Sequence, residues 1–214
     1  MICTATMLLV SCNNSSDDKK TDGTTPVDTS KKMADVKMET PPPAAALDSA
    51  TKMKNWMMCM TPGDMHKMIA SWNGTWSTEI TAYEPGKPPT KSTGTTVNKM
   101  ILGGRYQESL NTGNMMGMPF EGHGMLGYNN ATKLLENTWV DNMGTSISML
   151  KGAWDSATKS VTLTGKMTNP ETLAEMDYKE IFKVVDEKTQ TMEMYGPGPD
   201  GKETKMMELK FTRK

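Results

Sequence analysis

The sequence predicts an all-β protein: an antiparallel up-and-down barrel of calycin-like or lipocalin-like type, with about ten strands and one or two short helices before them. About ten runs of strand-forming residues follow one another from Thr75 onward, and turn residues bound each run. Apolar and polar residues alternate cleanly over 161–168 and again over 207–212. Consecutive antiparallel strands at this spacing favour a meander that closes into a barrel, because closure removes exposed edges.

The elements follow in order along the chain. Residues 48–60 begin with the cap residue Asp48 and carry apolar side chains at helical spacing. A second helix is expected from Thr61 as N-cap, with Pro62 in its first turn, to Asn73-Gly74. The expected strands are 75–84, 92–102, 105–112, 120–128, 133–141, 144–154, 161–168, 176–186, 190–195 and 207–212.

The connections between these strands differ at the two ends of the predicted barrel. One end collects short polar turns: 103–104, 129–133, 155–159 and 186–190. The other end collects connections rich in Gly and Pro or in Met: 85–89, the Met-rich loop 113–119, 141–144, 169–175 and 196–201. Tight turns mark a closed end and long irregular loops a mouth, so a ligand is expected to enter at the second end.

The N-terminus is typical of a bacterial lipoprotein. Residues 1–11 read as a signal segment whose apolar run is too short to span a membrane, and Leu9-Val10-Ser11-Cys12 resembles a lipobox. Cys12 is therefore the predicted site of lipidation, which would anchor the protein to the outer membrane of the cell envelope, facing the periplasm or the cell surface. The start lacks a basic segment, so the natural start is expected upstream.

The remaining chain divides into a tether and a domain. Residues 12–46 are rich in Ser, Asp, Lys, Thr and Pro, a composition typical of a disordered linker, and residues 47–214 form the barrel domain with its helices. The net charge of −1 gives no indication of a nucleic-acid partner. Once Cys12 is lipidated, Cys59 has no evident disulfide partner. Methionine, with 23 residues against 3 phenylalanines, is expected to build much of the core.

Several segments resemble one known family. They are Thr61-Pro-Gly-Asp-Met-His-Lys-Met, Met100-Ile-Leu-Gly-Gly-Arg-Tyr, Met116-Gly-Met-Pro-Phe-Glu-Gly, Leu126-Gly-Tyr-Asn-Asn, Thr138-Trp-Val-Asp-Asn-Met-Gly-Thr and Met194-Tyr-Gly-Pro-Gly-Pro-Asp-Gly-Lys-Glu. Over about residues 56–214 the chain is similar to the bacterial domain-of-unknown-function family fifteen seventy-nine. The resemblance implies a calycin-like barrel, often secreted or lipid-anchored, and no established activity. Gly74-Thr75-Trp76 also resembles the lipocalin Gly-x-Trp, which implies a cation–π contact between Trp76 and Arg213 at the closed end.

Metal binding and catalysis are weakly supported. His66 and His123 are the only histidines, and soft ligands near them (Cys59 and the methionines 115, 116 and 118) would suit Cu(I). Because methionine is abundant throughout, these clusters are interpreted as packing, and no metal or cofactor is predicted. No nucleophile motif is present, so no catalytic residue is assigned. Glu108, Glu121 or Asp141 beside Arg105 could still form an acid–base pair in the lumen.

The candidate ligand-binding residues gather around the expected mouth. If Trp139 points inward, Asn137 and Asp141 do too, and Arg105 or Tyr178 could be their polar partner. The glycine strings around His123 and at 196–201 are interpreted as turns or strand kinks. The predicted function is binding of a small apolar ligand; the alternatives are an envelope interaction module with a filled barrel and, less favoured, an enzyme using lumen carboxylates. The candidate binding residues are Arg105, Tyr106, Met116, Met118, Phe120, Glu121, Trp139, Asp141, Asn142 and Tyr178.

Overall fold

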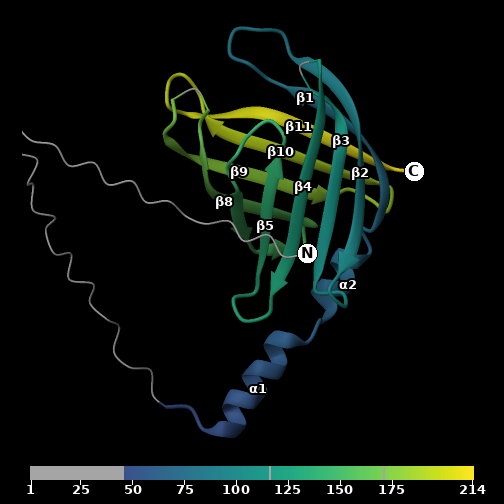
Figure 1. Ribbon diagram of the computed structural model, residues 1–214, viewed down its shortest axis with the longest axis vertical. Coiled ribbons are helices and arrows are strands. Elements are labelled where there is room, and N and C mark those ends of the chain that lie inside the picture. Colours follow the sequence, from purple (N-terminus) through teal and green to yellow (C-terminus); the bar gives the residue numbers. More distant parts are fainter. Residues whose placement is uncertain (1–45, 116, 171) are drawn as a thin grey trace, which may run out of the picture. The chain divides into compact units, whose positions relative to one another are not determined.

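The computed structural model describes residues 46–115, 117–170 and 172–214 (Figure 1). The predicted signal segment, Cys12, the tether up to residue 45, and Met116 lie outside the described residues. No helix in the described ranges is long and apolar enough to cross a membrane.

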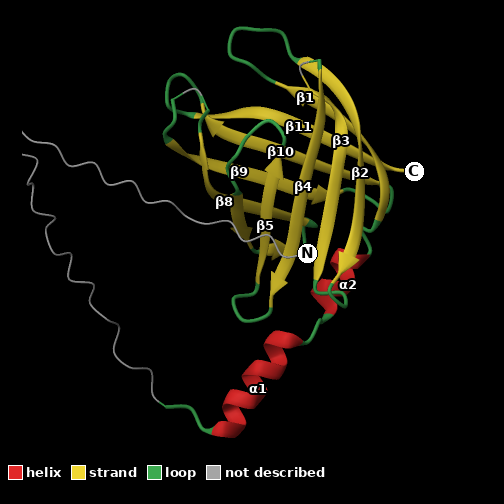
Figure 2. Cartoon of the chain, in the orientation of Figure 1, coloured by secondary structure: helices red, strands yellow, loops and turns green. Residues whose placement is uncertain are grey.

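The described chain forms one antiparallel sheet that closes into a barrel (Figure 2). Its strands are β1 (Gly74–Ala82), β2 (Thr90–Ile101), β3 (Tyr106–Met115), β4 (Met118–Asn129), β5 (Leu134–Asp141), β6 (Ser148–Gly152), β7 (Trp154–Asp155), β8 (Ser160–Thr168), β9 (Glu175–Val184), β10 (Thr189–Pro197) and β11 (Glu203–Arg213). From β1 to β6 and from β8 to β11, each strand pairs with the next one in sequence, and β1 also pairs with β11. The predicted meander is therefore confirmed.

Closure occurs where β6 pairs with β8. β7 continues the same ladder along β8 after a break at Ala153. Met149 of β6 pairs with Lys166 of β8, and Trp154 of β7 pairs with Val161 of β8. β6 and β7 thus occupy one position around the barrel, which makes it a closed antiparallel barrel of ten strand positions. The run expected as a single strand over 144–154 is interrupted but keeps its register.

Two glycines permit the close approach of backbones at this closure. A Cβ on Gly152 would lie 2.0 Å from the carbonyl oxygen of Thr162, and one on Gly165 would lie 2.4 Å from that of Met149. Real Cβ atoms do not approach a backbone oxygen so closely, so these positions require glycine.

Two helices precede the barrel. α1 (Ser49–Met60) begins where expected, with the Asp48 side chain accepting a hydrogen bond from the amide of Thr51 at 2.9 Å. α2 (Asp64–Ala70) begins later than predicted: its N-cap is Gly63, whose N–H donates to Nδ1 of His66 at 3.0 Å. Thr61 instead ends α1 and donates its hydroxyl to the Met57 carbonyl. The proline at position 62 follows that cap and does not start the second helix.

The short-turn end of the barrel is plugged by α2 and the residues after it. Ile69 and Trp72 are buried there, and Gln107 of β3 donates from Nε2 to the Ile69 carbonyl at 2.8 Å. The guanidinium of Arg213 lies 4.2 Å from the centre of the Trp76 ring, which confirms the predicted contact. The chain therefore closes this end with its first strand, its last strand and α2.

The core differs from the methionine-rich one that composition predicts. Among the described residues, the buried hydrophobic side chains are Ile69, Trp72, Trp76, Leu135, Leu150, Val161, Leu163 and Phe211. Methionine is absent from this set; Met192, Met194 and Met207 instead line the barrel interior, and Met53 and Met57 are exposed on α1. A long, flexible side chain suits the wall of a space that is not completely filled.

The connections between strands are distributed over the two ends of the barrel as predicted, with one correction. Turns 102–105, 130–133, 156–159 and 185–188 lie at the α2 end, and the longer loops lie at the other end, which we call the mouth. The prediction of a Met-rich loop over 113–119 is wrong. β3 runs to Met115 and pairs it with Met118 of β4, so a tight hairpin joins the strands, with Gly117 at φ +79°.

Candidate functional site

The barrel encloses a cavity of about 350 Å³. It extends from Trp72 and Leu135 at the α2 end to Phe120, Trp139 and Met143 at the mouth. The side chains that line it come from all around the barrel, because every second residue of a strand points inward. This cavity is the candidate functional site, and its two walls differ in chemistry.

One wall, on β1, β2 and β3, is polar. Thr78 and Thr96 share a hydrogen bond between their hydroxyls at 2.9 Å, and Thr96 donates to Oδ1 of Asn111 at 2.6 Å. Asn111 in turn donates from Nδ2 to the Ser109 hydroxyl at 3.0 Å. The network runs from β1 to β3 and fixes its members in place, so it presents the lumen with preorganised polar atoms.

The opposite wall, on β8 to β11, is largely apolar. Met192 lies between Phe182 and Leu209 in the ladder, and Met194 lies between Glu180 and Met207. All of these side chains line the cavity. The lumen is thus amphipathic: polar atoms face flexible thioether and aliphatic side chains across it.

Glu180 carries the one carboxyl group among the described lining residues of this wall, where Gln190 and Tyr178 are the other polar side chains. The Glu180 side chain is only 6% exposed, and its Oε2 has no hydrogen-bond partner among the described residues. Its neighbours across the ladder are Leu163 and Met194, neither of which can offset a charge. Burial therefore raises the pKa of Glu180 to about 7. Burial, reinforced by the nearby Glu180 carboxyl, also raises the pKa of Tyr178, so this phenol stays protonated.

The mouth carries a stacked aromatic pair. The rings of Phe120 and Trp139 lie 6.4 Å apart at an interplanar angle of 19°. Trp139 donates from Nε1 to Oδ2 of Asp141 at 2.7 Å, which orients the indole. The indole crosses β4 at two glycines: a Cβ on Gly122 would lie 2.3 Å from Trp139 Cζ2, and one on Gly124 would lie 3.4 Å from Cε3. The glycine string around His123 therefore makes room for Trp139 within a strand of continuous register, and the interpretation as a turn is wrong.

The cavity brings together four of the predicted binding residues: Phe120, Trp139, Asp141 and Tyr178. Trp139 points inward together with Asn137 and Asp141, as alternation predicts. The polar partner of Asp141 is neither Arg105 nor Tyr178. Its carboxylate accepts from the Trp139 indole and, at 2.9 Å, from the amide of Met143.

The other predicted residues lie elsewhere. The expectation that Arg105 faces the lumen is wrong: it sits in the β2–β3 turn at the α2 end and donates to the carbonyls of Met60 and Leu102. Tyr106 also lies at that end, on the outer face, where its ring covers Gly127. Met118 is half exposed in the hairpin at the mouth. The sorting of turns had already assigned 103–104 to the closed end, so the position of Arg105 and Tyr106, which directly follow that turn, could have been inferred from the sequence.

Glu121 and Asn142 border a shallow depression on the outside of β4 and β5. Its lining also includes His123, Val140 and the edge of Asp141. Nε2 of His123 lies 3.1 Å from Oε1 of Glu121, with the two side chains 48% and 61% exposed. A depression this open keeps both groups solvated, so it is a weaker binding site than the enclosed lumen. Glu108, expected as a possible lumen carboxylate, is exposed on the outer face of β3.

The ligands considered for copper are dispersed. Met115 lines the lumen, His123 lies on the outer face of β4, and Cys59 is exposed on α1. His66 is buried against Tyr128 with its ring edge-on, at 5.9 Å between centroids. Across the described ranges, no group of three or more His, Cys, Asp or Glu side chains is placed to hold a metal ion.

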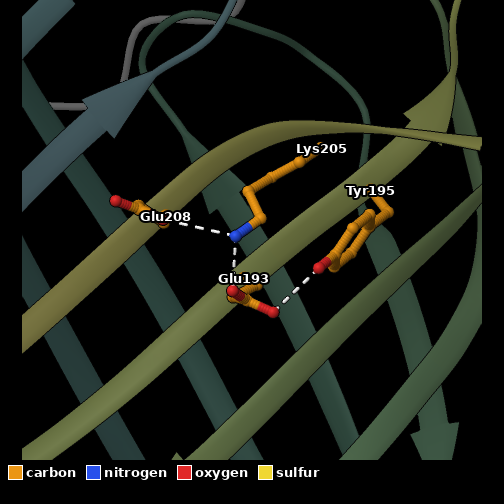
Figure 3. A network of polar contacts seen from close by, with 4 residues as sticks. All are labelled: Glu193, Tyr195, Lys205 and Glu208. Atoms are coloured by element: carbon orange, nitrogen blue, oxygen red, sulfur yellow. Dashed lines mark hydrogen bonds and ion pairs between the residues drawn. The ribbon is translucent and has the colours of Figure 1, made fainter. Parts of the chain in front are cut away.

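A second polar cluster lies on the outer face of β10 and β11 (Figure 3). Lys205 binds both Glu193 and Glu208, and Tyr195 donates its hydroxyl to Oε2 of Glu193 at 2.8 Å. The Lys179 ammonium lies 4.4 Å from the centre of the Tyr195 ring. These charges are mutually satisfied and link three neighbouring strands, so the cluster is best explained as cross-strand stabilisation.

Several lining residues were not found from the sequence, above all Glu180, Asn98 and the polar network on β1 to β3. A carboxylate at position 180 on the face shared with Tyr178 and Phe182 is the one signal that could have revealed Glu180. From 176 to 184, that face otherwise carries apolar or aromatic residues.

Fold and cavity together define an antiparallel β-barrel with a partly filled, amphipathic lumen. The chain belongs to the family described as "Protein of unknown function (DUF1579)", whose model matches residues 61–213. The resemblance drawn from its sequence motifs is thereby confirmed.

Comparison with solved structures bears on the barrel fold only. The chain is similar to the crystal structure of Rv2717c from M. tuberculosis, with a TM-score of 0.56 and 11% identity over 72% of this chain and 99% of that one. At that identity, the likeness shows the fold alone. A redesigned β-barrel matches at a TM-score of 0.35 and 14% identity, over 68% of this chain and 94% of that one. A search of curated proteins finds no match.

Proposed function

We propose that this protein is a lipid-anchored binding module of the bacterial envelope that holds a small, largely apolar molecule in its barrel. The cavity of about 350 Å³ carries this proposal. It falls within the range of roughly 300–1,000 Å³ typical of small-molecule sites.

The lining supports binding of a mostly apolar body. Met192, Met194 and Met207 form a flexible wall, and thioether side chains adapt to irregular ligands at low cost. At the mouth, the Phe120–Trp139 pair offers aromatic surface where a ligand would enter. A filled barrel acting only as an interaction module would lack such a space, which is why we favour a binder.

An enzyme is a weaker proposal. Catalysis by lumen carboxylates needs two ionisable groups that converge on one substrate. Asp141 lies at the mouth end of β5, where the indole of Trp139 already engages it, whereas Glu180 lies in the middle of β9. Their separate positions favour a site that binds a ligand and leaves it unchanged.

Native mass spectrometry of the protein purified from its own envelope tests the binding proposal. We expect a small molecule to co-purify, visible as extra mass that is lost on denaturation. Met192→Trp should fill the lumen and abolish this mass, whereas Met125→Trp makes the same change on the outer face of β4 and should keep it. A correctly folded wild-type protein that carries no ligand and binds no apolar probe would contradict the proposal.

The anchor rests on the sequence Leu9-Val10-Ser11-Cys12 and requires its own test. Growth of the producing bacterium with labelled palmitate should label the wild-type protein. Cys12→Ser should abolish labelling and release the protein from the membrane fraction, whereas Cys59→Ser, which alters the exposed thiol on α1, should leave labelling intact. Equal labelling of wild type and Cys12→Ser would exclude this anchor.

A further inference from the structure

The lumen contains a buried carboxyl group without a partner. Oε2 of Glu180 is shielded from solvent and accepts no hydrogen bond from any described residue. Buried polar groups in folded proteins are nearly always hydrogen-bonded, and one left unsatisfied at a cavity wall points to an occupant. Whatever occupies this site should supply a donor to Glu180.

A second orphaned acceptor lies on the other wall. The Asn98 side chain of β2 donates from Nδ2 to the Trp72 carbonyl at 3.3 Å, which leaves its Oδ1 buried and unpaired within the described part of the chain. Three strands (β1, β11 and β10) separate β2 from β9 around the barrel. Asn98 and Glu180 thus line the same lumen from well-separated walls. A ligand that donates hydrogen bonds would satisfy both, whereas a ligand that only accepts would leave the Asn98 oxygen unpaired and could bond to Glu180 only while its carboxyl group is protonated.

The charge of the lining is one-sided. Among the described residues that line the cavity, only Asp141, Tyr178 and Glu180 can ionise, and none is Lys, Arg or His. Met116 and Glu171, which lie outside the described residues, carry no positive charge either. An anionic ligand would enter this space without a counter-ion, next to carboxyl groups that repel it. A cationic ligand would find carboxylates at the mouth and in the interior.

The aromatic residues favour the same sign of charge. The indole of Trp139 and the ring of Phe120 border the entrance, and Tyr178 lies beside Glu180 on β9. The faces of such rings attract cations through their quadrupole. An ammonium group could therefore pass the mouth and reach Glu180 with favourable contacts along the path.

Resting on the proposed binding function, we propose that the ligand is a small organic amine, bound as its cation. Its ammonium group donates to the Glu180 carboxylate, and its apolar body lies against the methionine wall formed by Met192, Met194 and Met207. A charge-assisted hydrogen bond to a buried carboxylate gives both affinity and selection against neutral molecules of equal shape. Fatty acids, which share the apolar body but carry the opposite charge, are rejected.

Three probes of equal chain length separate charge from shape: octylamine, 1-octanol and octanoate. Each is titrated at neutral pH into the full-length protein and followed by calorimetry and by the fluorescence of the lumen tryptophans Trp72 and Trp139. We expect octylamine to bind at least tenfold more tightly than either of the others. In Glu180→Gln, this preference over octanol should disappear while octanol binding persists. Glu79→Gln removes the same charge from the outer face of β1 and should retain the wild-type preference.

The outcomes separate the two proposals. If octanol or octanoate binds as tightly as octylamine, or if Glu180→Gln retains the amine preference, the lumen is a binding site but the amine inference is overturned. If none of the three probes binds folded wild-type protein, the binding function itself fails. Circular dichroism and melting temperature establish that each variant is folded, and Glu180→Asp, which keeps the charge, should retain the amine preference if Glu180→Gln proves unstable.

Discussion

The surroundings of the buried Glu180 determine its protonation state and thereby affect the stability of the protein. The neighbours of Glu180 in the ladder are apolar, and its ring-bearing neighbour on the same strand, Tyr178, stays protonated. The carboxyl group therefore remains neutral more readily than an exposed one, with a pKa raised to about 7 from 4.5. In the free protein, this arrangement lowers stability whenever the group must ionise.

The stability of the protein should therefore depend on pH through Glu180. Between pH 4.5 and about 7, the folded state holds a proton that the unfolded chain has released, so the free energy of unfolding falls as pH rises. Glu180→Gln should remove this decline and gain about 2–3 kcal/mol relative to wild type between pH 5 and pH 8. Urea denaturation of both proteins at each pH measures the difference. Burial lowers the pKa of His66, which makes the free energy of unfolding rise with pH. This contribution is the same in both proteins and cancels in the comparison. Parallel pH profiles would contradict the prediction.

Gly122 and Gly124 provide a matched pair beneath one indole. A Cβ on Gly122 would meet Trp139 Cζ2 at 2.3 Å, whereas one on Gly124 would make ordinary contacts at 3.4 Å and beyond. Gly122→Ala should cost about 1–3 kcal/mol and shift the tryptophan emission, because the ring must move. Gly124→Ala should change stability by less than about 1 kcal/mol. Urea denaturation and emission spectra test both, and equal effects of the two changes would show that the indole is not held in this position.

At the scale of elements, the plug at the closed end depends on one side chain of β11. Arg213 donates to the carbonyls of Asn73, Ser71 and Glu187 while it covers the Trp76 ring. It thereby joins the segment after α2 to the last strand and to the β9–β10 turn. α1 is held differently: its last carbonyls accept from Arg105 and Asn130 in two closed-end turns, and none of its residues is buried.

Replacing Arg213 should therefore loosen α2 before it affects the mouth. Arg213→Gln removes the cation–π contact and most of the hydrogen bonds, at an expected cost of about 2–4 kcal/mol. Hydrogen exchange should rise first in α2 and β1. Lys210→Gln alters an exposed charge of the same strand and should remain within about 0.5 kcal/mol of wild type. Uniform exchange across the barrel in Arg213→Gln would argue against a local role.

At the scale of the whole molecule, the barrel depends on a seam that sequence neighbours do not form. β6 and β8 meet over only a few residue pairs, and β7 extends the contact toward the closed end. The close approach is possible because Gly152 and Gly165 have no side chain. The cavity exists only while this seam holds.

Gly165→Ala should open the seam. Its new Cβ would lie 2.4 Å from the Met149 carbonyl oxygen, so we expect a loss of at least about 2 kcal/mol and faster hydrogen exchange in β6 and β8 than elsewhere. Thr164→Ala changes the neighbouring outward-facing residue of the same strand and should cost about 1 kcal/mol or less. Native-state hydrogen exchange distinguishes the two, and protection of the seam in Gly165→Ala would refute the role given to this glycine.

The sequence by itself determined the order of the strands, their antiparallel meander and the sorting of turns into a closed end and a mouth. These features follow from local signals: alternation with a period of two, and turn residues between the runs. The inward orientation of Trp139 and Asp141 and the Trp76–Arg213 contact were predictable for the same reason, since each needs only strand parity or a known pattern. Arg105 was assigned to the binding site although it directly follows turn 103–104, which the same sorting places at the closed end.

Only the tertiary structure decided what shares the lumen. Glu180 and Asn98 lie far apart in the chain and face one space because closure brings their strands around a common axis. The volume left between the walls depends on how every inward side chain packs, and no single segment encodes it. The methionines show the same division: composition revealed their abundance, but only packing assigned them to the cavity wall rather than to the core.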